Sequence, residues 1–507
     1  MAEAMFERGQ IFGNLKKNQQ AISDFTWVVE HKGVDSARIA EVIADRAWYY
    51  MEEKKFEKAI ADCTRVINDS SAAEPIVLQC LANRGHSYAE TKQYRQAVAD
   101  YTRVLETKGA NAAYRSQALY RRADCYDSLG EYDGELADCT NLIGMKGAKS
   151  GDVYGAHCLR AHVYYVQTKF QLAIADDTFC IETASADSPE FLAEELTRRA
   201  YGYSRVAAYQ AGIADCTRAI NMDGVSASAR CDAHLNRARN YYASGKLDDA
   251  EKDFQCVLHY ARATTTQTAR ALIGRSDILY DHCRFDEELA ELSRVIAMKD
   301  VPTEQLFNAL CDRGTTLEDM GREAEATADF TRVIDSHDDS FERMPDAIAH
   351  RASSIAQQGD YARAASEAAR VMAMNGVPNA ASQTALLAHA LATWKLGRSD
   401  IAKKDFDKAI LTASPNSRAW IYIDRGSLYY DDGQTDAAIA DSTRAIELNG
   451  ISSMALSRAL LNRAMELAAH GNRDGATADY KRVVSITDAP AADKATAQKH
   501  LDSQTSR

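Results

Sequence analysis

The sequence predicts an all-α solenoid of thirteen antiparallel helix pairs, and three observations lead to this prediction. One phrase recurs along the chain, its copies follow one another at a nearly constant 38 residues, and only seven of the 507 residues are Pro. Scarce Pro among abundant helix formers favours helices. A fixed period of this length is typical of a repeat array in which each unit packs only against its neighbours.

The recurring phrase contains one acidic residue in nearly identical surroundings. It reads "AIADCTRVIN" from Ala59, "AVADYTRVLE" from Ala97, "ATADFTRVID" from Ala326 and "AIADSTRAIE" from Ala438. Sixteen residues before each acid stands an Arg, replaced once by His389. Counted in this way, thirteen copies form a single array over residues 1–488, and they leave no room for a separate catalytic domain.

Each copy reads as two helices. In the third copy, Leu78, Leu81 and Tyr88 fall on one face of a first helix, and after a break at "TKQY" the residues Tyr101 and Val104 fall on one face of a second. Apolar residues spaced by three and four are typical of a helix with one face to bury. Neither helix can bury that face alone, so neighbouring copies must stack. Residues 489–507 are expected to form a C-terminal capping helix and tail, with the helix over residues 491–501.

These residues resemble the tetratricopeptide repeat family over essentially the full chain. The family pattern has a small residue and an aromatic three positions later, followed by Ala and an aromatic four apart on the second helix. The third and ninth copies show it at Gly85, Tyr88, Ala97 and Tyr101, and at Gly314, Leu317, Ala326 and Phe330. The period exceeds the family's usual length of about 34 residues by about one helical turn, which we assign to the start of the first helix. The resemblance implies a right-handed superhelix whose first helices line the concave surface.

The repeated acid and base are interpreted as structural. A charged binding track is the alternative, but a site for one ligand needs particular residues at particular places, whereas this pair occurs in nearly every copy. Charges near a core are normally paired, so each Arg is expected to meet an Asp across packed helices. The Thr that follows the acid by two positions in eight copies is interpreted as bonding back to its own helix. The ladder includes Arg46, Asp62, Arg84, Asp100, Arg122, Asp138, Arg313 and Asp329.

Partner binding is expected where the copies diverge on the inner face. Arg and Tyr concentrate there in copies four to seven, and Arg suits carboxylates while Tyr supplies rigid contact area. We therefore expect an acidic peptide or loop to bind at this place, the alternative being an ordinary solvated surface. The candidate residues are Arg121, His162, Arg198, Tyr201, Arg205, Asn236, Arg239 and Tyr242.

The same faces turn acidic in copies eight, nine and twelve. A basic segment is one interpretation, and the solvated face of an acidic protein is the other. The residues are Asp277, Asp281, Asp312, Glu318, Asp319, Asp424 and Asp431.

Composition limits the classes of function. The net charge of −13 argues against a binder of phosphate backbones, so nucleic acid is not an expected partner. No apolar stretch reaches membrane-spanning length, and no basic segment followed by an apolar run marks a signal peptide. The eleven Cys are scattered singly, which favours a reducing compartment, and we expect a cytoplasmic protein. Catalytic motifs are absent and the His residues are dispersed, so we expect no enzyme activity, no cofactor and no metal.

The leading functional hypothesis is a non-enzymatic scaffold that presents a concave groove to a protein or peptide. The alternative is a regulatory sensor in which a bound peptide or small molecule changes the superhelix, because small rotations per repeat add up along a solenoid. A weaker third idea is RNA binding, which the acidic balance opposes.

Overall fold

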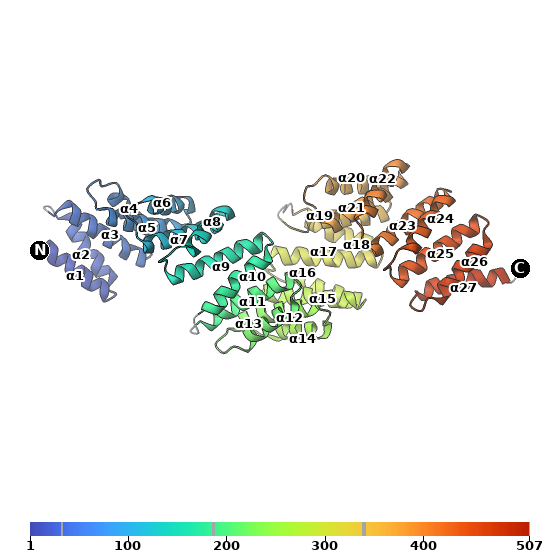
Figure 1. The fold of residues 1–507 in the computed structure, drawn as a ribbon, viewed down its shortest axis with the longest axis horizontal. Coiled ribbons are helices and arrows are strands. Elements are labelled where there is room, and N and C mark those ends of the chain that lie inside the picture. The colour runs from blue at the N-terminus through green and yellow to red at the C-terminus, as the bar shows by residue number, and fades with distance from the viewer. Residues whose placement is uncertain (32–33, 185–187, 337–340, 506–507) are drawn as a thin grey trace. The chain divides into compact units, whose positions relative to one another are not determined.

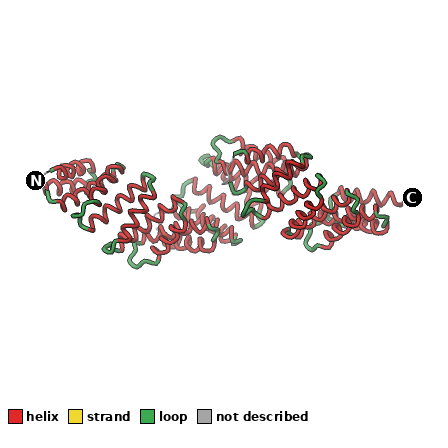
Figure 2. Tube along the Cα trace, turned by 90° about the horizontal axis from the view of Figure 1, so that it is seen from above, coloured by secondary structure: helices red, strands yellow, loops and turns green. Residues whose placement is uncertain are grey.

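The computed structural model describes residues 1–31, 34–184, 188–336 and 341–505. Over these ranges the chain forms 27 helices and no strand, and consecutive helices lie side by side as antiparallel pairs (Figure 1). Short loops join them (Figure 2). The predicted fold class, an all-α tetratricopeptide-type solenoid, is confirmed.

The chain divides into two compact units, residues 1–267 and 268–507. The continuous array predicted over residues 1–488 stays a prediction, and each unit is described separately. Unit 1 contains α1 (Ala2–Asn14), α2 (Asn18–Glu30), α3 (Ser36–Glu52), α4 (Phe56–Ile67), α5 (Glu74–Glu90), α6 (Tyr94–Glu106), α7 (Ala112–Leu129), α8 (Tyr132–Ile143), α9 (Ser150–Val166), α10 (Phe170–Thr183), α11 (Pro189–Arg205), α12 (Tyr209–Asn221), α13 (Ala227–Ala243) and α14 (Leu247–His259).

The boundary between the units falls inside α15 (Thr265–Asp281). Unit 2 continues with α16 (Phe285–Ala297), α17 (Thr303–Asp319), α18 (Glu323–Ile334), α19 (Met344–Gln357), α20 (Tyr361–Met372), α21 (Asn379–Lys395), α22 (Ser399–Thr412), α23 (Pro415–Asp431), α24 (Thr435–Glu447), α25 (Ser453–Ala469), α26 (Arg473–Ser485) and α27 (Ala491–Thr505). The predicted tail beyond α27, residues 506–507, lies outside the described residues.

The two helices of a pair differ in length and in neighbours. Most first helices, such as α3 and α5, have 17 residues, whereas second helices have 12 to 14. Within unit 1 the first helices also contact one another, α3 with α5, α5 with α7, and α7 with α9. The first helices therefore make a layer of their own, and side chains from successive pairs lie next to one another on it.

The recurring phrase supplies the packed face of each second helix. In α4 the residues Ala59, Asp62, Cys63 and Val66 are buried, and their spacing of three and four places them on one side. The Ala at the start of the phrase, such as Ala59, is fully buried against the neighbouring helices. The phrase thus brings its acid to the same buried face as its apolar residues.

The last helix, α27, packs against α26 and covers the end of the final pair. Ala497 is fully buried in this contact, and the ring of His500 stacks on Tyr480 with centroids 4.9 Å apart. No helix in the described part of the chain combines the length and apolar character that a bilayer crossing requires.

Candidate partner-binding surface

The ladder Arg connects two copies rather than one. Arg46 donates from Nε and Nη2 to the two carboxylate oxygens of Asp62 at 2.8 and 2.7 Å, and from Nη1 to the hydroxyl of Thr26 at 3.1 Å. Thr26 in turn donates to the carbonyl oxygen of Ile22 at 2.7 Å. The Thr therefore bonds back to its helix, as its sequence position predicts, and also accepts from the next copy. Equivalent three-bond arrangements occur at Arg84, Arg122, Arg199, Arg237, Arg313 and Arg463.

His389 meets the acid of its copy with one bond only, from Nδ1 to Asp405 at 2.6 Å. The preceding copy carries Ala369 where eight copies carry Thr, so no hydroxyl stands there to accept a second bond. The ladder side chains are thus engaged within the chain, and binding of a partner must use other residues of the inner layer.

A cavity of about 530 Å³ lies across the first helices α3, α5 and α7 of unit 1. Its wall combines aromatic, amide and charged side chains, a composition that suits a peptide better than a purely apolar ligand. The exposed ring of Trp48, 46% accessible, forms one side. The lining residues are Trp48, Met51, Glu52, Gln79, Ala82, Asn83, His86, Tyr101, Tyr114, Gln117 and Arg121.

Two polar atoms on residues that line this cavity are buried and have no hydrogen-bond partner among the described residues. They are Nδ2 of Asn83 and the hydroxyl of Tyr101, whose residues are 7% and 1% exposed. Tyr101 comes from the second helix α6 and passes Gly85, where a Cβ would approach its ring to 2.9 Å. Buried donors without partners cost about 1–3 kcal/mol each, so a ligand that accepts from them gains free energy.

Arg121 and Glu52 place one cation and one carboxylate on the wall of this cavity. Burial and the Arg121 charge lower the pKa of His86, so that its imidazole is neutral at pH 7. Burial raises the pKa of the Tyr101 hydroxyl far above its usual range, which keeps it a donor. Arg121 itself, half-buried, packs against the ring of Tyr120 at 5.7 Å.

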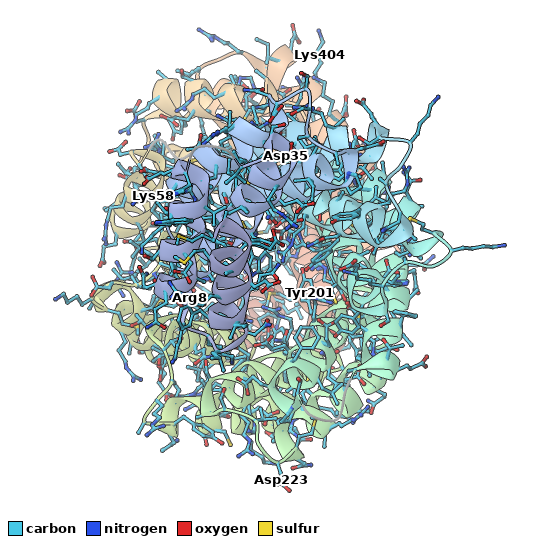
Figure 3. The ribbon with its side chains drawn as sticks, turned by 90° about the vertical axis from the view of Figure 1, so that its left-hand side faces the viewer. Arg8, Asp35, Lys58, Tyr201, Asp223 and Lys404 are labelled. Carbon is cyan, nitrogen blue, oxygen red and sulfur yellow. The ribbon has the colours of Figure 1, made fainter. Side chains whose placement is uncertain are left out.

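A second feature, the aromatic–arginine cluster, consists of Tyr165, Phe170, Tyr201, Arg205 and Arg239. The ring of Tyr201 lies 5.8 Å from Tyr165 and 6.4 Å from Phe170. Arg205 lies over Phe170 at 5.4 Å and Arg239 over Tyr201 at 5.6 Å. Tyr201 lies near the centre of the view in Figure 3, whereas Asp223, on a loop of the same unit, lies at its outer edge. The three rings come from α9, α10 and α11, and the two exposed Arg residues lie over two of them.

Other predicted residues lie elsewhere or have contacts within the chain. His162 contacts Asp127, with Nδ1 and Oδ1 3.0 Å apart. Asn236 is buried and donates to the carbonyl oxygen of Asp232 at 3.0 Å. Tyr242 is half-buried on α13. The structure therefore brings Tyr201, Arg205 and Arg239 together, places Arg121 at the separate cavity, and leaves Asn236 to its own helix.

Arg198 belongs to a buried charge cluster. It forms ion pairs with Asp177 and Glu195, and Tyr165 donates to Asp177 at 2.5 Å. Asp177 occupies a repeat position that is apolar in most copies, such as Tyr101 in the third. Although burial opposes it, the two acids raise the pKa of Arg198, and burial raises the pKa of Glu195 to about 7. Arg198 thus compensates a buried acid and is not a cation available to a partner.

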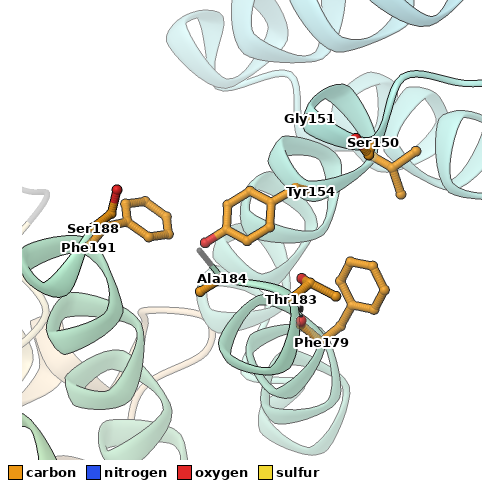
Figure 4. Close-up of a pocket in the computed structure, with 9 residues that line it drawn as sticks. Ser150, Gly151, Tyr154, Phe179, Thr183, Ala184, Ser188 and Phe191 are labelled. Carbon is orange, nitrogen blue, oxygen red and sulfur yellow. Dashed lines mark hydrogen bonds between the residues drawn. The ribbon is translucent and has the colours of Figure 1, made fainter. Parts of the chain in front are cut away.

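A further cavity of about 510 Å³ lies between α9, α10 and α11 and is mainly aromatic (Figure 4). Tyr154, Phe179 and Phe191 form its walls, and the rings of Tyr154 and Phe191 lie 5.5 Å apart. Residues 185–187, between Ala184 and Ser188 on its rim, lie outside the described residues. We assign this cavity no ligand.

Several of the acidic residues noted in copies eight and nine have contacts within unit 2. Asp312 accepts from Arg343 at 2.8 Å, and Asp319 accepts from the Tyr280 hydroxyl at 2.6 Å. Glu318 contacts Ser354 at 2.6 Å and His350 at 2.7 Å. These contacts favour the interpretation of a self-paired acidic face over that of a site for a basic segment.

Sequence reasoning missed Phe170 and the donors of the cavity. Phe170 is the first residue of α10, and the equivalent position in other copies also holds an aromatic residue, such as Phe56, Tyr94 and Phe285. This recurrence makes Phe170 look like a residue of the packing scaffold. Tyr101 fills a slot that holds Phe25 and Phe330 in other copies. The sequence did contain one indication of the cavity donor: packing at this position requires only an aromatic ring, as Phe shows, so the extra hydroxyl of Tyr101 is available for another role.

Comparison with known families identifies the repeats. One tetratricopeptide repeat profile matches residues 83–146, 235–301 and 311–381, and a second tetratricopeptide repeat profile matches residues 421–451. The chain therefore contains tetratricopeptide repeats, as its resemblance implies. Repeats of this family are generally protein-interaction elements. No curated protein sequence matches the chain significantly.

Solved structures with a similar arrangement have little sequence in common with it. The chain is similar to the crystal structure of the APC/C hetero-tetramer Cut9–Hcn1, with 13% identity, a TM-score of 0.41, and coverage of 95% of this chain and 98% of that one. It is also similar to a tetratricopeptide repeat protein from Parabacteroides merdae, with 18% identity, a TM-score of 0.34, and coverage of 62% and 98%.

Proposed function

We propose that the chain is a non-enzymatic scaffold that binds a partner protein along the first-helix layer of unit 1. The observation that carries the proposal is the cavity across α3, α5 and α7, with two buried donors that lack partners and a half-buried Arg121. These groups suit the carbonyl and carboxylate oxygens of an extended peptide. The proposed location of the protein is the cytoplasm, in keeping with its many free Cys.

The aromatic–arginine cluster supports an acidic segment as the partner's chemistry. Arg205 and Arg239 are exposed residues, and the rings beneath them supply rigid apolar area. In a segment with carboxylates next to an apolar residue, the carboxylates can contact the Arg residues and the apolar side chain can contact the rings. The same arrangement does not favour a phosphate backbone, because the unit also carries many acids and the chain's net charge is −13.

Peptide binding to the full chain tests this proposal. Labelled acidic peptides and composition-matched basic peptides are titrated by fluorescence polarisation, with the acidic set expected to bind. Arg121→Gln and Arg239→Gln are each expected to weaken the tightest peptide by about tenfold, as for the loss of one charged contact. Arg103→Gln removes an exposed Arg of α6 that lines neither feature, and it is the matched control. Equal affinity in all three variants, or preference for basic peptides, would overturn the proposal.

A further inference from the structure

One slot of the repeat is Ala in ten of the thirteen copies, three residues before the ladder acid. Ala59, Ala97 and Ala326 show how closely it is packed, because each is fully buried. Copies four and eight carry Glu135 and Glu288 there instead, and these side chains are also buried, at 0% and 2% exposure. A carboxyl group in a slot that otherwise holds a methyl group destabilises the fold unless another group compensates it.

The two exceptional acids differ in what surrounds them. Glu288 accepts a hydrogen bond of 2.6 Å from the Thr316 hydroxyl. Neither carboxyl oxygen of Glu135 has a hydrogen-bond partner among the described residues. The charges that act on Glu135 come from Asp127 and Asp124, and both are negative. Glu135 is thus a buried acid in an acidic environment, and a cation is the group that would compensate it.

Two further donor groups converge on Glu135 from adjacent first helices. Asp127 at the end of α7 and His162 on α9 have donor atoms that lie, with a carboxyl oxygen of Glu135 on α8, all within 4.8 Å of one another. Nδ1 of His162 and Oδ1 of Asp127 are 3.0 Å apart. A tetrahedral zinc site with bonds of about 2.0–2.2 Å places its donors about 3.4 Å apart. Small side-chain rotations therefore suffice to gather the three donors around one ion.

We propose that Asp127, Glu135 and His162 bind a divalent transition metal ion, with Zn²⁺ as the ion that best fits the donor set. The donor set contains an imidazole nitrogen beside two carboxylates. Mg²⁺ and Ca²⁺ prefer oxygen ligands only, so this set does not favour them. The affinity series places Zn²⁺ above Mn²⁺ and Fe²⁺ for such ligands. His162 and Asp127, with side chains 50% and 33% exposed, admit the ion from solvent, while Glu135 closes the buried side.

This site was not expected from the dispersed His residues of the sequence. The repeat nevertheless brings His162 of one pair next to Asp127 of the preceding pair, because the first helices α7 and α9 contact each other. Three protein ligands leave one position of a tetrahedral ion open to water. The site lies on the same layer of helices as the proposed partner surface, but its existence is independent of that function.

Zinc titration of the full chain, stripped with EDTA beforehand, tests the proposal. The expected result is one tight Zn²⁺ per chain in competition with a chromogenic chelator, a cobalt-substituted form with the visible spectrum of tetrahedral nitrogen–oxygen ligation, and a zinc-dependent rise in melting temperature. Glu135→Ala restores the residue that ten copies carry, so it is expected to fold and to weaken zinc binding by at least about tenfold. His162→Ala is expected to do the same.

Glu288→Ala is the matched control, since it makes the same change in the same slot of copy eight, and it is expected to leave zinc binding unchanged. Zinc binding of equal affinity in Glu135→Ala would assign the ion to another group of donors, such as Cys158, Cys180 and Glu195, and would overturn the proposal. Absence of tight zinc binding to the unaltered chain would overturn it as well.

Discussion

Arg46 and Asp62 form a two-pronged salt bridge in which each side chain is only 11% exposed. Arg8 and Asp24 form the same bridge with the same atoms, but Arg8 is 55% exposed. The first pair belongs to the second copy, which has a neighbour on either side, and the second pair belongs to the first copy. The chain itself therefore offers identical chemistry at two levels of Arg exposure. The energetic contribution of the ladder can be measured by comparing them.

Arg46→Ala is expected to destabilise α3 and α4 by about 3–5 kcal/mol, because it leaves the buried carboxylate of Asp62 without a cation. Arg8→Ala is expected to have a smaller effect, because Arg8 lies at the solvent and its removal opens the 6% exposed Asp24 side chain to water. Hydrogen exchange resolved by segment is the suitable measurement, because it reports on α3 and α4 separately from the rest of the chain. Equal protection losses in the two variants would show that the ladder is not maintained by buried pairing.

Thr102 provides a test of the connection between copies. Its hydroxyl accepts from Nη1 of Arg122 at 2.8 Å and donates to the carbonyl oxygen of Val98 at 2.8 Å. Thr102→Val preserves the shape but leaves an Arg N–H without its acceptor, which is expected to cost about 1–3 kcal/mol. Thr107→Val is the control, because Thr107 is half-buried and its hydroxyl donates to the carbonyl oxygen of Arg103 in the helix that precedes it, α6. Thermal unfolding of the two variants should differ, and identical midpoints would contradict the role of Thr102.

The fold could be predicted from the sequence because its evidence is periodic. A spacing of 16 residues joins Arg46 to Asp62, and the same spacing recurs in every copy, so one interpretation serves all. Contacts across copies were harder to predict. The bond from Arg46 to Thr26 spans 20 residues, and back-bonding already explained the Thr locally. Because the bond within its own helix already accounted for the Thr, its second bond, to the Arg of the next copy, was not predicted.

The candidate site was predicted less completely, and for a physical reason. Variable inner residues indicate where a partner can bind, but they do not show which of them the chain already uses. From the sequence, Arg198 is predicted to be an exposed cation. The structure shows that it pairs with Asp177, which occupies a usually apolar position of the preceding copy. Glu135 shows the reverse, because its departure from the Ala slot is visible in the sequence while the two ligands around it are not.

Tyr101→Phe separates binding from packing at the α3, α5 and α7 cavity. The Tyr101 hydroxyl is buried without a partner, so its removal is expected to leave stability unchanged or to raise it by about 1 kcal/mol. The same change removes a donor that a peptide can use, and it is expected to weaken acidic peptides several-fold. Thermal unfolding and fluorescence polarisation on one preparation give both quantities. A loss of stability together with unchanged affinity would show that the hydroxyl serves the fold.

Glu288→Gln is expected to stabilise unit 2 by an amount that depends on pH. Burial, with Asp312 and Asp319 adding to it, raises the pKa of Glu288 to about 7 although Thr316 donates to it. The folded chain therefore retains a proton that the unfolded chain releases above its ordinary pKa of 4.5. The stability that this proton provides is complete below about pH 4.5 and is lost as pH rises towards 7, at up to about 1.4 kcal/mol per pH unit.

The Gln variant carries no such charge and can still accept from the Thr316 hydroxyl. It is expected to match the unaltered chain near pH 4.5 and to exceed it by about 2–3 kcal/mol near pH 8, as measured by denaturant unfolding. Glu287→Gln is the control from the neighbouring position, where exposed Glu287 pairs with Arg284 and its pKa is lowered. Because a lowered pKa has the opposite sign, that variant gains nothing as pH rises. A Glu288→Gln advantage that stays constant from pH 4.5 to pH 8 would mean that Glu288 is ionised throughout, and that the slot tolerates a buried charge.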